Sequence, residues 1–403
     1  MHPINTPSTT ADFIIVGAGI VGLSIARALK QRDKTSKIII LEKESHCGEH
    51  ASGRNSGVLH AGFYYTADSL KAKFTREGNQ RWTAYCLEHH LPIRRCGKLV
   101  VARNQQELAG LDTLLERGKQ NNIKLTRISA QDARTIEPRV KTYEQALFSE
   151  TTASVSPQAI LTQLLKELSE QQVAFHYNTC VINQNNHCLQ TNRGSYEARY
   201  LINAAGLYAD QIAKRFGFAQ TYSILPFKGL YLYAAHEAGK LNTHIYPVPN
   251  LENPFLGVHF TITVDGQIKI GPTAIPAFWR EHYHGLSRFK AREMLAIVTQ
   301  ELRLLIDAKF NFRRLAMQEL MKYNRAILAQ QAAQLVSGVH PHHYRLWGKP
   351  GIRAQLLNTK TRRLEMDFIV EYDDRSMHIL NAVSPAFTCA LPFAEYVVNR
   401  IPK

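Results

Sequence analysis

The stretch that decides the fold is Phe13-Ile-Ile-Val16, followed directly by Gly17-Ala-Gly-Ile-Val-Gly22. The four apolar residues predict a short strand buried in a parallel sheet. A helical pattern follows over 23–31, and Lys37-Ile-Ile-Ile-Leu41 predicts a second strand. Strand, glycine turn, helix and strand in this order indicate a βαβ unit that opens a parallel sheet.

The glycines of this turn have the G-x-G-x-x-G spacing of a dinucleotide-binding fingerprint. Gly17 allows the tight turn, Gly19 lets the backbone approach a pyrophosphate, and Gly22 lets the helix pack closely on the strand. Glu42 ends the second strand, where its carboxylate can accept hydrogen bonds from ribose hydroxyls. An acidic residue there argues against a 2′-phosphate and so against NADP. FAD and NAD share the fingerprint and both remain possible at this point.

Two later segments favour FAD over NAD. Residues 51–62, ASGRNSGVLHAG, combine hydroxyl, amide and guanidinium donors for phosphate and ring oxygens with glycines that permit close backbone approach. Leu201-Ile-Asn-Ala-Ala-Gly206 predicts an apolar strand that ends in small residues, against which a cofactor can lie. The complete set of predicted cofactor-binding residues is Gly17, Gly19, Gly22, Glu42, Lys43, Ser52, Arg54, Asn55, Ser56, Gly57, Val181, Ala205, Gly206, Gly351, Ile352 and Ser384.

Length and composition exclude several classes of protein. The 403 residues, 45% of them hydrophobic, fit one large or two medium domains with ample core and exclude a disordered chain. The six cysteines are scattered without a C-x-x-C spacing, which argues against a disulfide scaffold or zinc site. The chain starts without a secretory signal pattern, and glycines and Arg27 interrupt its longest apolar stretch. We therefore expect a cytoplasmic protein, or one held peripherally on the inner face of the cell membrane.

The order of the predicted elements, βαβ-like, then antiparallel strands, then βαβ-like again, predicts two interleaved domains. The expected class is α/β with an α+β cap: a Rossmann-like FAD-binding domain and a mixed- or antiparallel-sheet substrate domain. Within the cap, Asp265-Gly266 between two apolar runs predicts a hairpin over 256–271. The expected boundaries are 1–90, 150–220 and 340–403 for the FAD-binding domain, and 91–149 and 221–339 for the cap.

Positive charge is concentrated in the C-terminal third of the chain. The formal net charge is +16, and residues 286–363 hold 15 Lys and Arg against 4 Asp and Glu, 15 − 4 = +11. Such a region is a solvated basic surface or attracts acidic metabolites or phospholipid headgroups; nucleic acid is not expected, because no recognition motif is present. Residues 287–306 also predict an amphipathic helix. Its buried stripe is expected to hold Leu295, Val298, Leu302, Leu305 and Ile306.

The order of these motifs resembles the D-amino-acid-oxidase-like FAD-dependent oxidoreductases, from about Asp12 to the C-terminus. Several segments narrow the resemblance to the L-2-hydroxyglutarate dehydrogenase/oxidase branch. These segments are SGVLHAGFYY (56–65), SLKAK (69–73), CGKLV (96–100), YPVP (246–249), PFLGVHF (254–260) and NAVSP (381–385). The resemblance implies oxidation of L-2-hydroxyglutarate to 2-oxoglutarate by hydride transfer to flavin N5, with electrons passing to a quinone or to oxygen.

Oxidising a 2-hydroxy acid requires a base for the hydroxyl proton and cations for the carboxylates. The general base is expected to be His60, which by resemblance passes beside the flavin ring, or His259, on a cap strand. Arg353 and Lys228 follow turn residues near strand ends and are the predicted carboxylate ligands, because an arginine fork matches a carboxylate. Tyr64 and Tyr65 either line the pocket or fill the core, and Tyr65 is taken as a predicted substrate ligand.

Two further expectations concern the C-terminal third. Ser384 and Pro385 predict the N-cap and first residue of a helix, whose N-terminus would stabilise negative charge on the flavin pyrimidine. The run His340-Pro-His-His343 has a proline inside it and no acidic partner nearby, so it predicts a solvent loop and no metal site.

Two alternatives keep the fold and change the function. One is an oxidoreductase for an amine, an amino acid or glycerol-3-phosphate. An amine would favour a carboxylate or aromatic cage, and the segment expected to line the pocket is not acidic. The other is a flavin-binding partner protein without turnover, in which loss of His60 and His259 would leave activity unchanged.

Overall fold

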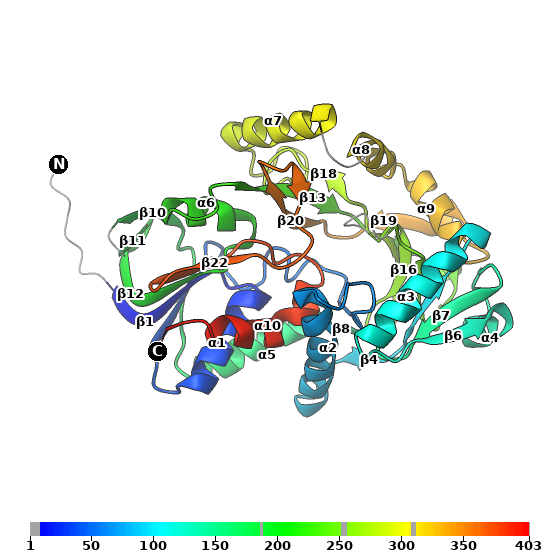
Figure 1. The fold of residues 1–403 in the computed structure, drawn as a ribbon, viewed down its shortest axis with the longest axis horizontal. Coiled ribbons are helices and arrows are strands. Elements are labelled where there is room, and N and C mark those ends of the chain that lie inside the picture. Colours follow the sequence, from blue (N-terminus) through cyan, green and yellow to red (C-terminus); the bar gives the residue numbers. More distant parts are fainter. Residues whose placement is uncertain (1–8, 186–187, 251–255, 308–311, 403) are drawn as a thin grey trace. The chain divides into compact units, whose positions relative to one another are not determined.

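The computed structural model describes residues 9–185, 188–250, 256–307 and 312–402 (Figure 1). The chain forms two compact units and passes between them repeatedly. Unit 1 comprises Met1–Gly53, Gln158–Ile224 and Ala354–Lys403, and unit 2 comprises Arg54–Pro157 and Leu225–Arg353. The boundaries differ from the expected ones chiefly over residues 54–90, which group with unit 2: β3 pairs there with β8, and the long helix α2 follows.

Unit 1 is built on an eight-stranded, mostly parallel sheet. Its order is β10-β11-β12-β1-β2-β9, and β23, which also pairs with β22, lies beside the second half of β12. The predicted βαβ opening is present, with β1 parallel to both β2 and β12. The strands are β1 (Thr9–Val16), β2 (Ile38–Leu41), β9 (Ala174–His176), β10 (Val181–Asn185), β11 (Cys188–Thr191), β12 (Gly194–Asn203), β22 (Val370–Tyr372) and β23 (Ser376–Ile379).

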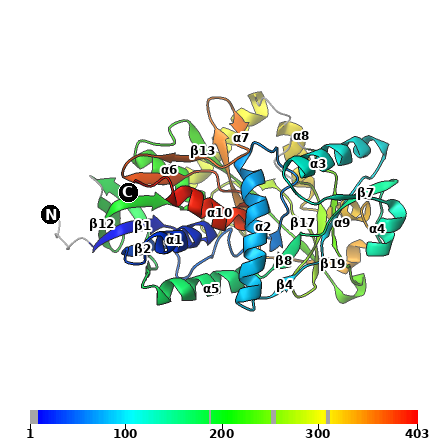
Figure 2. The ribbon, with the colours of Figure 1, turned by 60° about the horizontal axis from the view of Figure 1, so that its bottom comes forward.

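Helices cover both faces of this sheet. In Figure 1, α6 lies above the sheet and α1 and α10 lie below it; α1 contacts α10 directly (Figure 2). Residues 13–16 and 38–41 of the central strands are buried throughout, which explains their continuous apolar pattern. The helices of this unit are α1 (Ile20–Arg32), α5 (Pro157–Glu170), α6 (Ala209–Arg215) and α10 (Ala386–Val398), with the short 3₁₀ helix η2 (Gly206–Tyr208).

Unit 2 contains a second eight-stranded sheet, of mixed direction. Its order is β19-β14-β17-β16-β15-β5-β7-β6, in which β15 and β5 are parallel and the other neighbours are antiparallel. The predicted hairpin is β16–β17, turning at Asp265-Gly266 with φ +91° at Gly266. The strands are β5 (Lys98–Val101), β6 (Thr126–Ser129), β7 (Gln145–Ser149), β14 (Leu232–Ala234), β15 (His244–Pro247), β16 (His259–Ile262), β17 (Ile268–Gly271) and β19 (Tyr344–Trp347).

Smaller elements complete unit 2 and the crossings. Strand β8 pairs with both β3 and β4, and β13 pairs with β18. The remaining strands are β3 (Val58–Leu59), β4 (Ile93–Arg94), β8 (Ala153–Val155), β13 (Tyr222–Gly229), β18 (Ile275–Pro276), β20 (Gly351–Asn358) and β21 (Arg363–Leu364). The helices are α2 (Leu70–Glu88), η1 (Gln105–Glu107), α3 (Leu108–Gln120), α4 (Ala130–Ile136), η3 (His236–Ala238), α7 (Ala291–Asp307), α8 (Phe312–Met321), α9 (Arg325–Ala333) and η4 (Pro341–His343).

The predicted helix at 287–306 exists as α7, but its predicted buried stripe is wrong. Leu295, Leu302 and Ile306 are 69%, 53% and 76% exposed. The buried side chains are instead Ile297, Glu301 and Leu304, while Val298 and Leu305 are half-buried. Apolar residues surround most of this helix, so its sequence permits several stripes, and packing against unit 2 selects one of them.

Two further observations concern cysteines and membrane spans. All six cysteines are free thiols. Among the described residues, no helix combines the length and the hydropathy needed to cross a bilayer.

Candidate cofactor site and active site

The turn between β1 and α1 requires glycine at two positions. Gly17 has φ +108°, and a Cβ there would lie 2.6 Å from the carbonyl oxygen of Ala204. A Cβ on Gly22 would lie 2.0 Å from the carbonyl oxygen of Gly17. A side chain at Gly22 would push the helix off the strand and its turn, and one at Gly17 would collide with the segment after β12, so the local packing explains both residues.

The N-terminus of α1 offers backbone donors at this turn. Gly19 is the N-cap and has no side chain to satisfy the first turn. The backbone N–H of Ile20 donates to Ser52 Oγ at 2.9 Å, so Ser52 lies at the helix N-terminus. The open backbone and the positive end of the helix dipole suit a phosphate group.

Glu42 is held beside the same turn. Its side chain is buried, and Oε2 accepts a hydrogen bond from Ala18 N at 2.8 Å while Oε1 accepts one from Glu44 N at 2.9 Å. Each carboxylate oxygen keeps a second lone pair, which can accept a ribose hydroxyl. Thr179 N donates to the Glu42 carbonyl at 2.8 Å, which brings the start of β10 at Val181 close to the end of β2.

The small residues after β12 lie next to the end of β1. Ala204 N donates to the Val16 carbonyl at 3.0 Å. Asn203 is fully buried; its Nδ2 donates to the Ala209 carbonyl at 2.8 Å, and its Oδ1 accepts from Ala205 N at 3.2 Å. These bonds fix residues 204–206 at the carboxyl edge of the sheet, where α/β folds bind nucleotides.

Two of the predicted cofactor residues in unit 1 have other arrangements than expected. Lys43 Nζ contacts the Glu44 carboxylate and lies 2.9 Å from His50 Nε2, so its charge is already engaged. Ser384 is not the N-cap of α10: that position is Pro385, and no side chain caps the helix. The helix starts one residue later than its Ser-Pro pattern predicts, which removes the capping role of the Ser384 hydroxyl.

The remaining predicted cofactor residues form a local turn in unit 2. Asn55 Oδ1 accepts from Gly57 N at 2.8 Å, and Ser56 Oγ accepts from the N–H of Val58 at 3.3 Å, so both side chains help to close the turn. A Cβ on Gly351, which precedes Ile352, would lie 2.5 Å from the Arg54 carbonyl oxygen. The Arg54 guanidinium lies 4.4 Å from the ring centroid of Tyr283.

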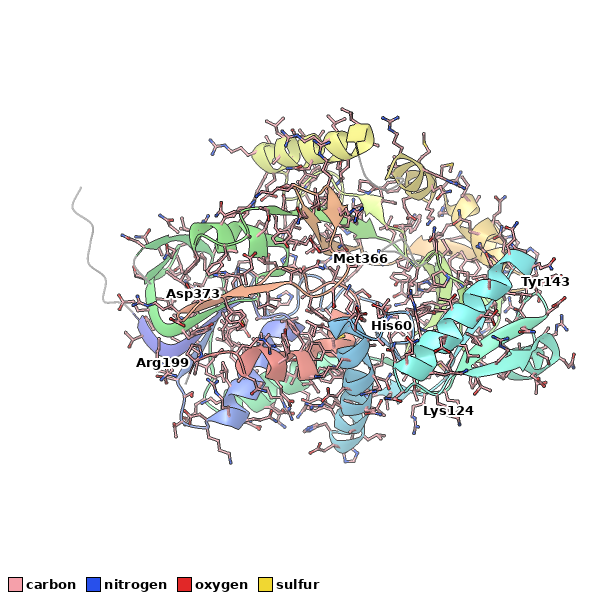
Figure 3. The ribbon with its side chains drawn as sticks, viewed as in Figure 1. His60, Lys124, Tyr143, Arg199, Met366 and Asp373 are labelled. Carbon is pink, nitrogen blue, oxygen red and sulfur yellow. The ribbon has the colours of Figure 1, made fainter. Side chains whose placement is uncertain are left out.

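His60 lies directly after β3 and is buried (Figure 3). Asn79 on α2 fixes its backbone, because Asn79 Nδ2 donates to the carbonyls of Leu59 and His60 at 3.1 and 3.2 Å. Burial lowers the pKa of His60 well below its usual value, and the charge of Lys98 lowers it further. The imidazole is therefore neutral at pH 7.

Lys98, the first residue of β5, is the buried cation at the centre of this cluster. Its Nζ lies 3.5 Å from His60 Nδ1 and faces the rings of Tyr246 and Tyr64, at 4.2 and 5.1 Å from their centroids. Burial lowers the pKa of Lys98 to about 7. Among the described residues, no carboxylate pairs with this ammonium group. The site therefore lacks the anion that a buried lysine normally requires.

His259 begins β16 and stacks on Tyr246, with ring centroids 3.7 Å apart. Its Nδ1 lies 2.9 Å from the Gly257 carbonyl oxygen, which only accepts, so Nδ1 carries the proton. Burial lowers the pKa of His259 well below its usual value, and the charge of Lys98 contributes. The ring is neutral, and among the described residues its Nε2, which accepts, has no hydrogen-bond partner.

Two more cations of unit 2 lie near this cluster, the half-buried Arg353 and the buried Lys269. Arg353 Nη1 donates to the Thr273 carbonyl at 3.3 Å, and its charge is felt at His259. Lys269 on β17 donates to the Ser56 carbonyl at 3.0 Å, and burial lowers the pKa of Lys269 to about 8. Both histidines therefore feel the charge of Lys98, and His259 also feels that of Arg353, whereas the histidine that feels the charge of Lys269 is His244.

The contacts described for the other two predicted substrate ligands, Lys228 and Tyr65, do not place them in the cluster around Lys98. Lys228 is buried, which lowers its pKa to about 8, and the titratable group that feels its charge is His282. Tyr65 is half-buried, with Lys71 Nζ 5.9 Å from its ring centroid. Its neighbour Tyr64 is the better candidate for a substrate ligand, because the buried Tyr64 hydroxyl has no hydrogen-bond partner among the described residues.

Sequence reasoning missed three side chains of this site: Lys98, Lys269 and Asn79. One of them could have been predicted from the sequence: Lys98 is a charged residue at the start of the apolar run Leu99-Val-Val-Ala102. A lysine in such a position is buried unless the strand lies at an edge. Lys269 alternates with apolar residues in the same way on β17.

A family model described as FAD dependent oxidoreductase (DAO) matches residues 12–400. The chain belongs to this family. It is 33% identical over 403 residues to an L-2-hydroxyglutarate dehydrogenase of Escherichia coli K12, covering 97% of this chain and 93% of that protein. It is also 33% identical over 433 residues to a mitochondrial L-2-hydroxyglutarate dehydrogenase of Nematostella vectensis, covering 99% and 92% of the two chains.

Solved structures agree on the fold. The FAD-bound L-alpha-glycerophosphate oxidase of Mycoplasma pneumoniae superposes with a TM-score of 0.76 at 23% identity, covering 97% of this chain and 94% of that one. The predicted α/β flavoprotein architecture is thereby confirmed, and so is FAD as the cofactor of this oxidoreductase. The glycine turn, the helix N-terminus and Glu42 supply the cradle and the acceptors that the FAD adenosine diphosphate requires.

We expect Glu42→Gln to weaken FAD binding. The amide would offer one acceptor instead of two and turn an N–H toward a backbone N–H, so the dissociation constant of FAD should rise roughly 10-fold, as for loss of one charged hydrogen bond. Fluorescence titration of the apoprotein with FAD measures this constant. Glu170→Gln, at an exposed position of α5, is the matched control. Equal affinity in both variants would contradict a ribose-binding role of Glu42.

Proposed function

We propose that this flavoprotein oxidises L-2-hydroxyglutarate to 2-oxoglutarate. The relatives with that name share 33% identity over nearly their whole length. The observation that carries the proposal is Lys98, a fully buried cation with no carboxylate partner among the described residues, set beside two neutral histidines. A substrate carboxylate supplies the missing anion, and a dicarboxylate suits a cluster with several cations.

The reaction removes a hydride from C2 and a proton from the C2 hydroxyl, which leaves the 2-oxo acid. FAD, when bound, accepts the hydride. The protein must hold the carboxylates, accept the hydroxyl proton and keep C2 in a fixed orientation.

We assign the proton acceptor to His259. Its Nδ1–H is committed to the Gly257 carbonyl, so Nε2 points its lone pair away from that bond and can take the hydroxyl proton. The lowered pKa of His259 belongs to the protein without substrate. A dianion bound nearby raises that pKa again, because an opposite charge favours the imidazolium.

His60 takes the opposite role in this proposal. The Lys98 ammonium only donates, so His60 Nδ1 accepts and the proton of the neutral ring lies on Nε2. His60 is then a hydrogen-bond donor to a substrate oxygen. Lys98 and Arg353 bind carboxylate, Arg353 by its planar fork, and the unpartnered hydroxyl of Tyr64 donates to the same anion.

The pH dependence follows from the direction of these shifts. Lys98 and Lys269 have pKa values lowered to about 7 and about 8, so the free enzyme loses cations as the pH rises through this range. His259 is already deprotonated, because its pKa is lowered well below the usual value. We expect kcat/KM for L-2-hydroxyglutarate to fall above about pH 7 to 8, with no acid limb near the usual histidine pKa of about 6.5.

Initial rates between about pH 5.5 and pH 9.5 test this expectation. An acid limb with an apparent pKa near 7 would contradict it. That result would indicate that neutral Lys98 accepts a proton from His60 and makes His60 the base.

The substrate assignment is tested by product analysis. The purified enzyme is incubated with a soluble electron-accepting dye and L-2-hydroxyglutarate, D-2-hydroxyglutarate, lactate, glycerol-3-phosphate or amino acids, and 2-oxo products are identified by mass spectrometry. We expect 2-oxoglutarate from the L-enantiomer. Lactate, with one carboxylate, should react with a much lower kcat/KM. Faster turnover of an amino acid or of glycerol-3-phosphate would overturn the assignment.

The electrons leave, in this proposal, to a quinone or to oxygen, and the protein works in the cytoplasm or at the inner face of the cell membrane. Peroxide formation in air, compared with reduction of a soluble quinone, separates an oxidase from a dehydrogenase. Stoichiometric peroxide would exclude the quinone.

A further inference from the structure

A large part of the exposed apolar surface lies on one region of unit 2. Of the seventeen large hydrophobic side chains exposed among the described residues, ten lie between 278 and 323. The most exposed of these ten are 53% to 79% accessible: Leu286, Leu295, Leu302, Ile306 and Met317. Single exposed apolar residues are normal, but a concentration of this kind marks an interaction surface.

Helices α7 and α8 carry this region and contact each other, and α8 also contacts β18 (top of Figure 1). On α7, Leu295, Leu302 and Ile306 follow one another at spacings of seven and four residues, which places them on one stripe. The opposite stripe, with Ile297 and Leu304, is buried in unit 2. The outward stripe of α7 is therefore apolar without a covering element among the described residues.

Cations share this outward face. Arg292 and Arg303 are exposed on α7, next to Leu295 and Leu302, and Arg313 and Arg314 are exposed at the start of α8. We call this surface, of α7, α8 and the preceding segment 278–290, the α7–α8 face.

The carboxylates of the α7–α8 face do not neutralise these arginines. Glu293 pairs with Lys290, Glu281 pairs with Arg288, and the buried Glu319 pairs with Lys322. Glu301 is buried beneath α7. Among the side chains that the structure describes in this region, a set that leaves out Asp307, no carboxylate is exposed, so the described face is both apolar and positively charged.

We propose that the α7–α8 face docks on the surface of an anionic lipid bilayer. A helix of this kind lies in the plane of the interface, with its apolar stripe among the acyl chains near the headgroups. The arginine stems lie along the apolar surface and their guanidinium groups reach the lipid phosphates. The inference adds a docking surface to the proposed function, does not depend on the identity of the substrate, and locates the protein where a membrane quinone is available.

A second copy of the chain fits this face less well. A two-fold contact would place the same surface on both sides, so Arg292 and Arg303 would face cations of the partner. Apolar interface cores are also depleted in charge, whereas here arginines alternate with leucines along α7. Lipid phosphates supply the complementary charge that a second copy lacks.

The test uses the full-length FAD-loaded protein and sedimented vesicles of phosphatidylcholine, with or without phosphatidylglycerol. The wild type should bind the anionic vesicles and bind the neutral ones at least roughly 10-fold more weakly. High salt should weaken binding, because the charge contribution is screened.

Two double variants separate the apolar and the charge contributions. Leu302→Gln with Ile306→Gln, and Arg292→Gln with Arg303→Gln, should each lower partitioning into anionic vesicles roughly 10-fold. The matched control is Leu87→Gln with Ile182→Gln, because both of those side chains are 55% exposed outside the face. The control should bind as the wild type does.

Turnover with a soluble dye keeps this test separate from the substrate assignment. All three variants should retain wild-type turnover, since none of the residues lies in the cation–histidine cluster. Wild-type protein that does not sediment with anionic vesicles, or face variants that bind as tightly as the control, would overturn the proposal. So would light scattering that shows a dimer for the wild type without vesicles and a monomer for the face variants, because a second copy would then cover the face.

Discussion

Replacement of His259 by asparagine is expected to lower kcat/KM for L-2-hydroxyglutarate by about 10²- to 10⁴-fold, the contribution of a positioned general base. The asparagine can keep the hydrogen bond to the Gly257 carbonyl, but it offers no basic nitrogen to the substrate hydroxyl. FAD should stay bound, since the glycine turn and Glu42, which suit its adenosine diphosphate, are unchanged. Rapid-reaction measurement of flavin reduction isolates this step from product release.

Comparison with His60→Asn separates the two histidines. His60 is assigned as a donor, and its loss should raise KM more than it lowers the rate of flavin reduction. His236→Asn, at an exposed histidine of η3, should be neutral. The two roles would be exchanged if His60→Asn lowered the rate of flavin reduction strongly while His259→Asn left that rate nearly unchanged.

Lys98→Met is expected to lower kcat/KM roughly 10- to 100-fold, as for the loss of one charged hydrogen bond to the substrate. The effect should appear mainly in KM, because Lys98 binds carboxylate in the ground state and in the transition state alike. Lys98→Arg should recover part of the loss. Lys124→Met, at an exposed lysine of the same unit, serves as the control.

The Lys98→Met variant should also be more stable than the wild type. If Lys98 had only a structural role, its replacement would instead lower the stability of the protein. Burial lowers the pKa of Lys98 to about 7, below the unfolded value of about 10.4, so between these pH values the unfolded chain binds more protons. The wild type therefore loses stability as the pH falls toward 7. Methionine removes this cost, and we expect a gain of about 1–3 kcal/mol at pH 7, measured by thermal or denaturant unfolding. A lower Tm for Lys98→Met would show that Lys98 holds the fold.

The cofactor half of the site is predictable because its signals are local. Gly17, Gly19 and Gly22 lie within six residues of one another, and Glu42 ends the next strand. Their roles follow from one βαβ unit whose geometry is nearly fixed. The expected N-cap role of Ser384 was wrong for a local reason as well, since the helix starts at Ala386 and Pro385 takes the N-cap position.

The substrate half of the site depends on contacts between distant segments. Lys98 faces Tyr246 because β5 pairs in parallel with β15, with His244 opposite Lys98. That pairing joins residues almost 150 positions apart, and the sequence of neither strand indicates which strand it pairs with. His60 and His259 could be predicted because histidine is a common general base. The roles of Lys98 and Asn79 follow only from their contacts in the folded protein.

Helix α7 shows a third limit of sequence patterns. Its apolar residues occupy several stripes, and hydrophobicity alone does not reveal which stripe is buried. The structure buries Ile297, Glu301 and Leu304 and leaves Leu302 and Ile306 outside. That reversal is the basis of the docking proposal. Two residues of the PFLGVHF segment, Pro254 and Phe255, lie outside the described residues.

The central claim is that buried cations of unit 2 select a dicarboxylic 2-hydroxy acid for oxidation by the FAD of this enzyme. Anaerobic mixing of the purified yellow protein with single substrates, followed by visible flavin absorbance, tests it most directly. We expect L-2-hydroxyglutarate to bleach the flavin rapidly, and the D-enantiomer, lactate, glycerol-3-phosphate and amino acids to bleach it slowly or not at all. Rapid bleaching by a substrate with a single carboxylate or an amine, and none by L-2-hydroxyglutarate, would contradict the account.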